Sequence, residues 1–367
     1  MKPKILFILH LPPPIHGAAM MGKYIQESEL VNSSFDCFCI NLATAGSLSD
    51  IGHISLKKLL KYFFLLKHIS HVVREIRPEL VYITPNAGGK AFFKDFIVVQ
   101  MLKSMGCKVI AHYHNKGVSV YQSKWVYNFF YKRFFSNLKV ILLAENLYKD
   151  IAKYVKREDV YICPNGIPSS CKEEMEARRN NVIPHLLFLS NLLISKGVIV
   201  LLDALKILKE KEYTFVCQFI GGETAEINAV QFFEEVNKRE LSDLVTYVGR
   251  KVREEKEAFF RQADIFVFPT YYETFGLVNL EAMEYKLPVI STNEGGIPDI
   301  VKDGENGLIC EKQNPVSLAD CIAKLLDDEE LRVKMGSAGH EKFCREFTLD
   351  KFENRMRDIL NQNLFSS

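Results

Sequence analysis

Short apolar runs alternate with longer amphipathic stretches along the chain, and this alternation limits the fold more than any other feature. The first half contains the runs KILFIL, LVYIT, KVIAHY, VILLA and VYIC, and the second half contains HLLFLSN, TFVCQFIG, LVTYVG, DIFVFP and PVIST. Intervening segments such as SLKKLLKYFFLLKHISHVVREI carry apolar residues at helical spacing. Strands that alternate with helices build βαβ units with a parallel sheet. The sequence therefore predicts an α/β fold.

A polar linker separates two series of these units. Residues 164–184 read PNGIPSSCKEEMEARRNNVIP, with three prolines and a charged middle, a composition typical of a connection between domains. A chain of 367 residues is also long for one hydrophobic core. We therefore expect one Rossmann-like domain at 1–166 and a second at 167–346, followed by a helix at about 347–367.

The stretch PTYYETFGLVNLEAMEYKLPVIST at 269–292 carries the densest local pattern. An apolar run that ends at its first residue predicts a strand, apolar residues at helical spacing over 277–287 predict a helix, and PVIST predicts the next strand. Gly276 permits a tight turn into the helix. Glu273 precedes that helix, and Glu281 lies one to two turns inside it with its side chain leaning back toward the helix N-terminus.

These two carboxylates indicate the chemistry of a ligand. The first N–H groups of a helix at the carboxyl end of a parallel sheet attract anions such as phosphate. An ionised carboxylate only accepts hydrogen bonds, so Glu273 and Glu281 suit hydroxyl groups instead. The pattern favours a ligand that is both phosphorylated and polyhydroxylated. The alternative is two solvated acids that flank a helix.

Charge divides unevenly between the two halves. Residues 1–166 hold 22 Lys and Arg and 11 Asp and Glu, so from totals of 47 and 45 the remaining residues hold 25 and 34. The first half therefore carries +11 and the second −9. A basic half suits an anionic partner such as a nucleic acid, a phospholipid surface or a pyrophosphate-linked acceptor. The basic half contains no recognisable nucleic-acid-binding motif, so we expect no nucleic acid.

Nine scattered cysteines form no C-x-x-C pair. The sequence therefore suggests neither a zinc site nor a disulfide framework, and it favours a reducing compartment. The N-terminal apolar run has seven residues and ends in prolines, which is too short for a signal peptide or a membrane span. We expect a cytoplasmic protein.

The segment ETFGLVNLEAMEYKLPVISTNEGGIPDIVKDGENGLIC at 273–310 resembles the signature of retaining glycosyltransferases of the GT4 family. Supporting matches are PPPIHGAA near the start, PNGI at 164–167, SNLLISKG at 190–197 and YVGRKVREE at 247–255. The resemblance implies the GT-B fold, two Rossmann-like α/β domains that face each other across a cleft. It assigns the nucleotide-sugar donor to the C-terminal domain and the acceptor to the N-terminal domain, to which the last helix crosses back.

The same resemblance assigns roles to the residues around the two carboxylates. It implies that Glu281 takes both ribose hydroxyls of the nucleotide and that Glu273 takes a hydroxyl of the donor sugar. Backbone N–H groups around Thr274, Phe275 and Gly276 would reach the sugar and the phosphates. These roles agree with the ligand chemistry that the local pattern favours.

Neutralising the diphosphate requires cations, since negative charge develops on it when the nucleotide leaves. Lys196 matches the family's phosphate-binding lysine, with a solvated lysine as the alternative. Five residues earlier, the family's usual arginine is replaced by Asn191. The loss of one fork-shaped cation weakens neutralisation unless another group compensates, and Arg250 is the candidate. The alternative for Arg250 is an ordinary surface arginine.

Two further candidates lie in the N-terminal half. Gly17 follows the first predicted strand and lets the backbone approach phosphates or the acceptor; the alternative is a simple turn. His114 ends the strand KVIAHYH and matches the family position near the sugar's 6-hydroxyl, although a structural histidine would read the same. A D-x-D motif is absent from the sequence, so we expect no metal and no other cofactor.

Together these features predict a retaining hexosyltransferase that acts without a metal. The expected donor is a nucleotide-sugar, with UDP-sugars as the favoured class. The expected acceptor is a glycan or a lipid-linked oligosaccharide in cell-surface polysaccharide biosynthesis. The alternatives are a non-catalytic subunit that binds nucleotide-sugars and a phosphorylase or epimerase of the same fold.

Two basic aromatic stretches in the N-terminal half predict contact with the inner face of a membrane. Residues 55–74 and 124–139 interleave lysines and arginines with leucines and aromatic residues, a composition typical of interfacial helices. In the second stretch the aromatic residues that support this prediction are Trp125, Phe129, Phe130, Phe134 and Phe135. The alternative is that both helices only bury an apolar face against the sheet.

Overall fold

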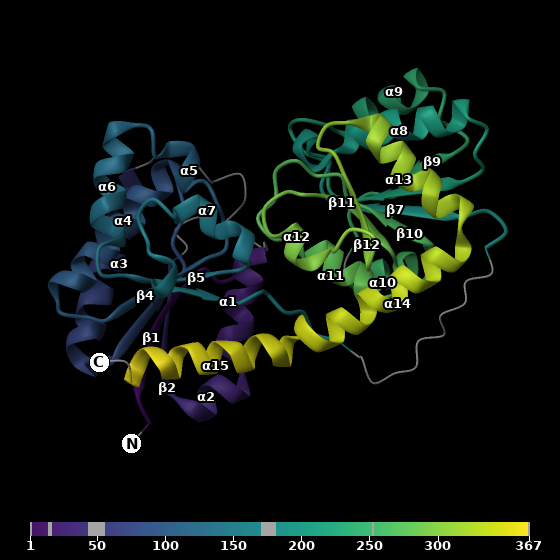
Figure 1. Cartoon of the computed structure of the whole chain (residues 1–367). Coiled ribbons are helices and arrows are strands. Elements are labelled where there is room, and N and C mark those ends of the chain that lie inside the picture. The colour runs from purple at the N-terminus through teal and green to yellow at the C-terminus, as the bar shows by residue number, and fades with distance from the viewer. Residues whose placement is uncertain (1, 14–16, 43–55, 170–180, 252, 366–367) are drawn as a thin grey trace. The chain divides into compact units, whose positions relative to one another are not determined.

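The computed structural model describes residues 2–13, 17–42, 56–169, 181–251 and 253–365 (Figure 1). The chain divides into two compact units. Unit 1 consists of Met1–Asn165 with Asp350–Ser367, and unit 2 consists of Gly166–Leu349. The break lies one residue from the expected boundary at 166, and most of the linker expected at 164–184 lies outside the described residues.

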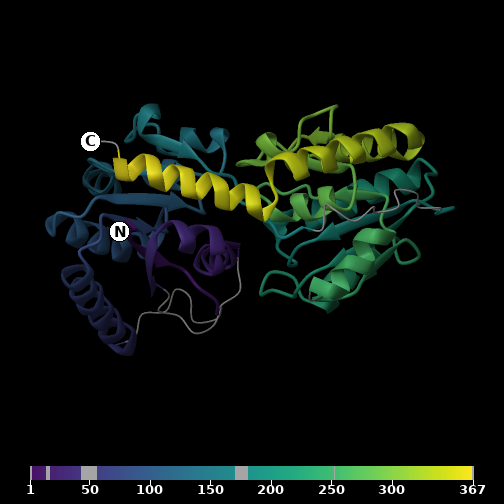
Figure 2. The ribbon, with the colours of Figure 1, turned by 90° about the horizontal axis from the view of Figure 1, so that it is seen from below.

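Unit 1 contains a six-stranded parallel sheet of order β2-β1-β3-β4-β5-β6. Its strands are β1 (Lys4–Leu9), β2 (Asp36–Asn41), β3 (Leu80–Ile83), β4 (Val109–Tyr113), β5 (Lys139–Leu142) and β6 (Val160–Ile162). Its helices are α1 (Gly17–Glu27), α2 (Glu29–Ser34), α3 (Leu56–Ile76), α4 (Gly89–Ser104), α5 (Val118–Tyr121), α6 (Trp125–Phe135), α7 (Tyr148–Ile151) and α15 (Leu349–Phe365). Figures 1 and 2 show α15 lying along this unit.

Aromatic side chains fill the core between α4 and α6. The ring of Phe92 lies 4.5 Å from that of Tyr131 and 5.5 Å from that of Phe134, measured between centroids. Tyr131 is fully buried, and its hydroxyl donates a hydrogen bond of 2.6 Å to the backbone oxygen of Ala87. These contacts connect α6 to the segment that follows β3. Part of the aromatic excess in the basic stretch 124–139 therefore serves the core.

Unit 2 contains a second six-stranded parallel sheet, of order β12-β11-β10-β7-β8-β9. Its strands are β7 (His185–Leu189), β8 (Val216–Ile220), β9 (Val245–Tyr247), β10 (Ile265–Val267), β11 (Val289–Thr292) and β12 (Gly307–Cys310). Its helices are α8 (Val198–Glu210), α9 (Ala229–Lys238), α10 (Arg253–Gln262), α11 (Leu277–Glu284), α12 (Ile297–Ile300), α13 (Pro315–Asp327) and α14 (Glu329–Glu346). The expected α/β class with parallel sheets is confirmed.

The strand, loop, helix and strand predicted over 264–292 are present as β10, α11 and β11. The helix ends earlier than its apolar spacing suggested. Lys286 adopts a positive φ of 55°, and the N–H of Leu287 bonds back to the oxygen of Ala282. Pro288 follows and cannot continue a helix. Leu287 is therefore buried as part of the turn.

Two further properties of the described residues are the state of their cysteines and the hydrophobicity of their helices. Seven cysteines in the described part of the chain are free thiols, whereas Cys344 is disulfide-bonded. The sequence suggested no disulfide framework, and an isolated cysteine such as Cys344 carries no spacing signal that would reveal a single bond. Within the described residues, none of the helices has the length and apolar character that crossing a membrane requires.

Candidate functional site

The strand order places a topological switch point between β7 and β10 in unit 2. From β7 the chain continues to β8 and β9 on one side, and it then returns to β10 on the other side. The loops that leave the carboxyl ends of β7 and β10 therefore diverge, and open α/β sheets bind ligands at such a point. Lys196 lies in the loop after β7, and Glu273 lies in the loop after β10.

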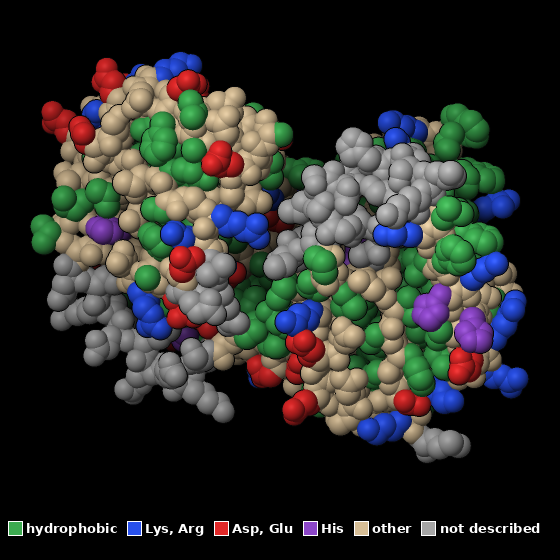
Figure 3. Space-filling model, turned by 180° about the vertical axis from the view of Figure 1, so that it is seen from behind, with side chains coloured by type: hydrophobic (Ala, Val, Ile, Leu, Met, Phe, Trp, Pro, Cys, Tyr) green, Lys and Arg blue, Asp and Glu red, His purple; other side chains and the backbone are tan. Residues whose placement is uncertain are grey.

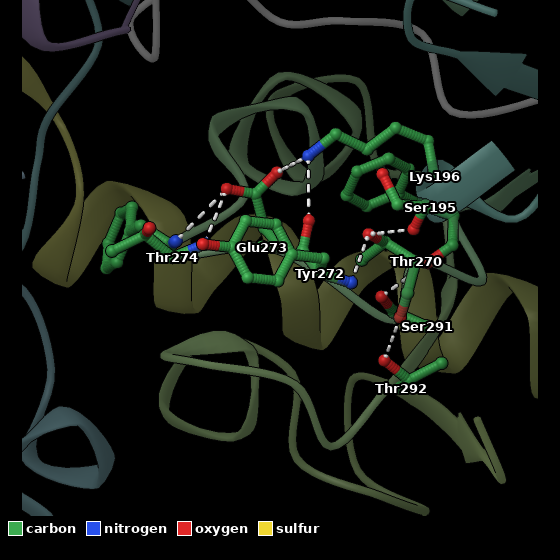
Figure 4. Close-up of polar contacts among 10 residues, drawn as sticks. Ser195, Lys196, Thr270, Tyr272, Glu273, Thr274, Ser291 and Thr292 are labelled. Carbon is green, nitrogen blue, oxygen red and sulfur yellow. Dashed lines mark hydrogen bonds and ion pairs between the residues drawn. The ribbon is translucent and has the colours of Figure 1, made fainter. Parts of the chain in front are cut away.

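These two side chains form an ion pair (Figure 4). The amine of Lys196 donates to Oε2 of Glu273 at 2.8 Å and to the backbone oxygen of Tyr272 at 3.0 Å. Both side chains are about four-fifths buried, with exposed fractions of 19% and 21%. An ammonium has three N–H donors, so these two bonds leave one donor of Lys196 for a ligand.

The second oxygen of Glu273 binds its own backbone. Oε1 accepts hydrogen bonds from the N–H of Thr274 at 2.7 Å and from the N–H of Phe275 at 3.3 Å. The sequence assigned these two N–H groups to the sugar and phosphates of a ligand, but in this structure they bind the carboxylate. A ligand that uses them must therefore compete with Glu273. The ring of Phe275 is buried and lies 6.3 Å from that of Phe347.

Hydroxyl groups anchor the loop after β10 to its neighbours. Thr270 donates to the backbone oxygen of Ser195 at 3.1 Å, which ties the loop to that of Lys196. Thr292 at the end of β11 donates to the oxygen of Thr270 at 2.6 Å, and Ser291 donates to that of Phe268 at 2.8 Å. Figure 4 shows these anchors beside the ion pair. They hold the site on three neighbouring strands.

A glycine lets the loop after β11 approach the loop after β10. Gly295 has a φ of +55°, and a Cβ there would lie 2.4 Å from the backbone oxygen of Glu273 and 2.6 Å from that of Thr274. The next residue, Gly296, donates its N–H to the oxygen of Thr274 at 2.8 Å. Any larger residue at 295 would displace the backbone that presents Glu273.

Glu281 lies on α11, which begins directly after Gly276. Gly276 has a φ of +86°, a conformation that glycine adopts without strain. Both carboxylate oxygens of Glu281 accept from the amine of Lys256 on α10, at 2.9 and 2.8 Å. Lys256 directly follows the motif YVGRKVREE at 247–255 and is not part of it, and only the tertiary structure brings its side chain to α11.

Asn191 and Arg250 both lie beside Gly222 at the end of β8. The side-chain oxygen of Asn191 accepts the N–H of Gly222 at 3.0 Å. A Cβ on Gly222 would lie 3.1 Å from that oxygen and 3.9 Å from Cδ of Arg250. Asn191 therefore joins two loops, and the exposed Arg250 is a cation within reach of the same edge.

Unit 1 carries the two remaining predicted residues. His114 follows β4, and its ring centroid lies 4.2 Å from that of His112. His112 is fully buried and shares a 2.6 Å hydrogen bond with the hydroxyl of Tyr82. Burial, reinforced by His114, holds the pKa of His112 well below its ordinary value, so His112 stays neutral. Gly17 is the first residue of α1 and is exposed, and Pro14, Ile15 and His16 before it lie outside the described residues.

A buried acid at the carboxyl edge of unit 1 was not found from the sequence. Oδ2 of Asp95 accepts from the backbone N–H and the side-chain amide of Asn86, both at 2.8 Å. The side-chain oxygen of Asn115 accepts the N–H of Ala87 at 2.7 Å. Burial raises the pKa of Asp95 from 3.8 to about 6, against the opposing effect of the bonds from Asn86. Asp95 lies on a helix between phenylalanines, where no motif marks it.

The structure thus brings together most of the predicted site residues in one unit. Those in unit 2 are Asn191, Lys196, Arg250, Glu273, Thr274, Phe275, Gly276 and Glu281, and those in unit 1 are Gly17 and His114. Across the described ranges, no group of three or more His, Cys, Asp or Glu side chains is arranged to hold a metal ion.

Unit 2 has a parallel Rossmann-type sheet with paired charges at its switch point, and the chain has the α/β architecture of the GT-B fold. Residues 174–342 match the family model of glycosyl transferases group 1. The matched residues include all eight predicted site residues of unit 2.

Individual relatives agree with the family-model match. The chain is 35% identical over 176 residues to an uncharacterised glycosyltransferase of Methanocaldococcus jannaschii, which covers 48% of this chain and 47% of that protein. It is 32% identical over 172 residues to the capsular polysaccharide biosynthesis glycosyltransferase CapM of Staphylococcus aureus, covering 47% and 44%. The chain thus spans less than half the length of these curated relatives.

A solved structure matches over nearly the whole chain. The Anabaena protein HepE in complex with UDP-glucose superposes with a TM-score of 0.74 at 17% identity, covering 98% of this chain and 99% of that one. At this identity the match concerns the fold of both units.

Proposed function

We propose that this protein transfers a sugar from a nucleotide-sugar to a glycan or a lipid-linked acceptor. The observation that carries the proposal is the Lys196–Glu273 ion pair at the switch point of a group 1 glycosyltransferase domain. A cation and a carboxylate side by side suit a ligand that has a diphosphate next to a hydroxylated sugar.

The proposed reaction breaks the bond between the anomeric carbon and the diphosphate oxygen. The electron pair of that bond leaves with the nucleoside diphosphate, and the acceptor oxygen bonds the anomeric carbon on the same face, so the configuration is retained. The acceptor proton passes to the leaving phosphate oxygen. Lys196, through its remaining N–H, stabilises the charge that develops there, which is the largest contribution available to such a site.

Three further groups have proposed roles in this reaction. Glu273 binds a hydroxyl of the sugar and orients it. The family resemblance assigns His114 to the 6-hydroxyl of the sugar, and we propose the same role for it here. Arg250 supplements Lys196 at the diphosphate in place of the arginine that Asn191 replaces. Side-chain cations do the work of a metal here, so we propose a metal-independent enzyme.

The UDP-sugar class and the polysaccharide context are proposals that rest on relatives. HepE has been solved with UDP-glucose, and CapM is named for capsular polysaccharide biosynthesis. Both fit a phosphorylated, polyhydroxylated donor and a glycan acceptor.

We also propose that unit 1 binds the cytoplasmic face of an anionic membrane. On α3, the apolar side chains Leu59, Leu60, Phe63 and Phe64 are exposed, and on α6 so are Trp125, at 81%, and Phe129. The guanidinium of Arg133 lies 4.6 Å from the ring of Phe129. Figure 3 shows hydrophobic side chains intermingled with Lys and Arg on one face of the protein. Such a surface can insert rings at the headgroup boundary while its cations meet phosphate.

A donor screen tests the proposed activity. Titration calorimetry with UDP-, GDP- and ADP-sugars should reveal one preferred base, and NMR of the product should show the donor's anomeric configuration. Turnover should persist in EDTA. Phosphorolysis with orthophosphate or epimerisation without an acceptor would identify the rival enzymes, and binding without turnover on any acceptor would identify a non-catalytic subunit.

Vesicle flotation tests the membrane proposal. The protein should float with anionic vesicles at low salt, less so at high salt, and binding should fall in Lys132→Glu/Arg133→Glu. Both side chains are exposed, so the double variant should fold. An absence of binding at low salt would refute the proposal.

A further inference from the structure

We propose that Lys256 is a positioning residue for nucleotide recognition, which holds the carboxylate of Glu281 in the orientation in which it accepts hydrogen bonds from the hydroxyls of a ribose. The inference rests on the proposed function, since it assumes that Glu281 meets the ribose of a nucleotide. It adds a residue from α10 to a site that the sequence confined to the loops and to α11.

The geometry of the pair carries the inference. The amine of Lys256 lies 2.9 Å from Oε1 and 2.8 Å from Oε2 of Glu281, so it bridges both oxygens. Each carboxylate oxygen has two lone-pair directions, of which the bridge occupies one. The bridge takes the directions that converge between the two oxygens, so the remaining direction on each oxygen points outward, one to either side of the carboxylate. A ribose hydroxyl can therefore donate to an open side of the carboxylate while the bridge fixes its orientation.

The charges support the same conclusion. Glu273 and Glu281 would together repel a diphosphate, but Lys196 pairs with the first and Lys256 with the second. The four side chains therefore sum to zero, and a cation such as Arg250 adds attraction. Without Lys256 the site would carry an uncompensated carboxylate near the phosphates.

The burial of the pair separates it from surface ion pairs. Lys256 and Glu281 have side-chain exposed fractions of 20% and 27%, close to those of Lys196 and Glu273. By contrast, Lys206 and Glu210 on α8 lie 3.7 Å apart with exposed fractions of 49% and 64%. Exposed pairs of that kind contribute little because water and salt screen them. A partly buried bridge restrains its carboxylate far more.

A double-mutant cycle on the full chain tests the inference. The probe is whichever of UDP, GDP and ADP binds the wild type most tightly, titrated by calorimetry into wild type, Lys256→Met, Glu281→Gln and the double variant. We expect Lys256→Met to weaken binding about tenfold in the wild-type background, as for the loss of one hydrogen bond to a charged group. In the Glu281→Gln background the same change should have almost no effect, because Lys256 acts through Glu281.

Controls separate this role from folding and from direct contact. Lys206→Met should bind like wild type, and Lys256→Arg should restore most of the affinity because its fork also bridges a carboxylate. At saturating donor the turnover of Lys256→Met should stay near that of wild type. Equal tenfold losses of affinity in both backgrounds would mean that Lys256 contacts the ligand itself. That result would overturn this inference and leave the proposed function standing. Failure of all three diphosphates to bind wild type would overturn the proposed function as well.

Discussion

The two units contain sheets of the same size that differ in strand order and in the chemistry of their carboxyl edges. In unit 1 the second strand lies at the edge next to the first, whereas in unit 2 the first three strands run outward in sequence before the chain returns to the other side. Unit 1 presents buried polar groups such as Asp95 and His112, and unit 2 presents the pairs Lys196–Glu273 and Lys256–Glu281.

This difference separates groups that hold a loop from groups that meet a ligand. Asp95 and His112 are each at most 1% exposed, so their hydrogen-bonding groups are shielded from solvent. The four charged side chains of unit 2 keep about a fifth to a quarter of their surface exposed, at 19–27%. A charged ligand can reach the second set and not the first. The units also differ in net charge, which favours an anionic partner for unit 1.

The largest effect should come from the lysine at the switch point. Lys196→Ala should lower turnover by roughly a hundredfold or more, since a cation beside a leaving diphosphate acts most strongly as charge develops. Steady-state kinetics at saturating donor would measure it, with Lys206→Ala as the control on the exposed α8 pair. Normal turnover of Lys196→Ala would mean that Lys196 has no catalytic role, and it would remove the functional difference between the carboxyl edges of the two sheets.

The buried acid of unit 1 should affect stability with a defined pH dependence. Burial raises the pKa of Asp95 from 3.8 to about 6 in the folded protein, so the folded protein binds the proton more tightly than the unfolded chain does. This contribution to the free energy of unfolding is fully present below the unfolded pKa and is lost as the pH rises through 6. Asp95→Asn keeps an acceptor for Asn86 without the charge. Its free energy of unfolding relative to wild type should rise by roughly 2 kcal/mol between pH 4.5 and 7.5.

Urea unfolding at both pH values would measure that change. Nucleotide affinity should be the same in Asp95→Asn as in wild type, because the buried carboxyl of Asp95 anchors Asn86 and is not exposed to a ligand. A pH-independent stability difference would contradict the assignment of a buried carboxyl with a raised pKa.

The ribose carboxylate should matter for binding more than for folding. Glu281→Ala should weaken the nucleotide at least about tenfold, as charge-assisted hydrogen bonds are lost. Its free energy of unfolding should fall by about 1 kcal/mol, less than the loss in binding, because the amine of Lys256 left behind is 20% exposed and water can solvate it. Calorimetric titration and urea unfolding would give the two numbers, and unchanged affinity would refute the role of Glu281.

The smallest effect should come from restoring the family's arginine. Asn191→Arg removes the hydrogen bond to the N–H of Gly222 and should cost about 1 kcal/mol of stability. Donor affinity should stay within about twofold, because Arg250 already supplies a cation beside Gly222. A clear gain in affinity would instead mean that the diphosphate site is under-neutralised as it stands.

Local sequence patterns determined the elements and the chemical type of the site. The alternation of apolar runs predicted parallel strands and helices, and the segment around Gly276 predicted β10, α11 and β11. Glu273 and Glu281 could be selected because loop ends, helix starts and glycines follow rules of short range, whereas Lys196 was selected by its match to a family motif. The position where α11 ends depended on a turn at Lys286 that apolar spacing does not encode.

Only the tertiary structure decided which groups meet. Strand order placed the loop of Lys196 beside that of Glu273, 77 residues away in sequence, and it brought Lys256 to Glu281. It also turned the N–H groups of Thr274 and Phe275 onto a carboxylate and buried Asp95. Ion pairs and burial depend on distances in space between distant segments, whereas sequence periodicity reports only neighbours along the chain.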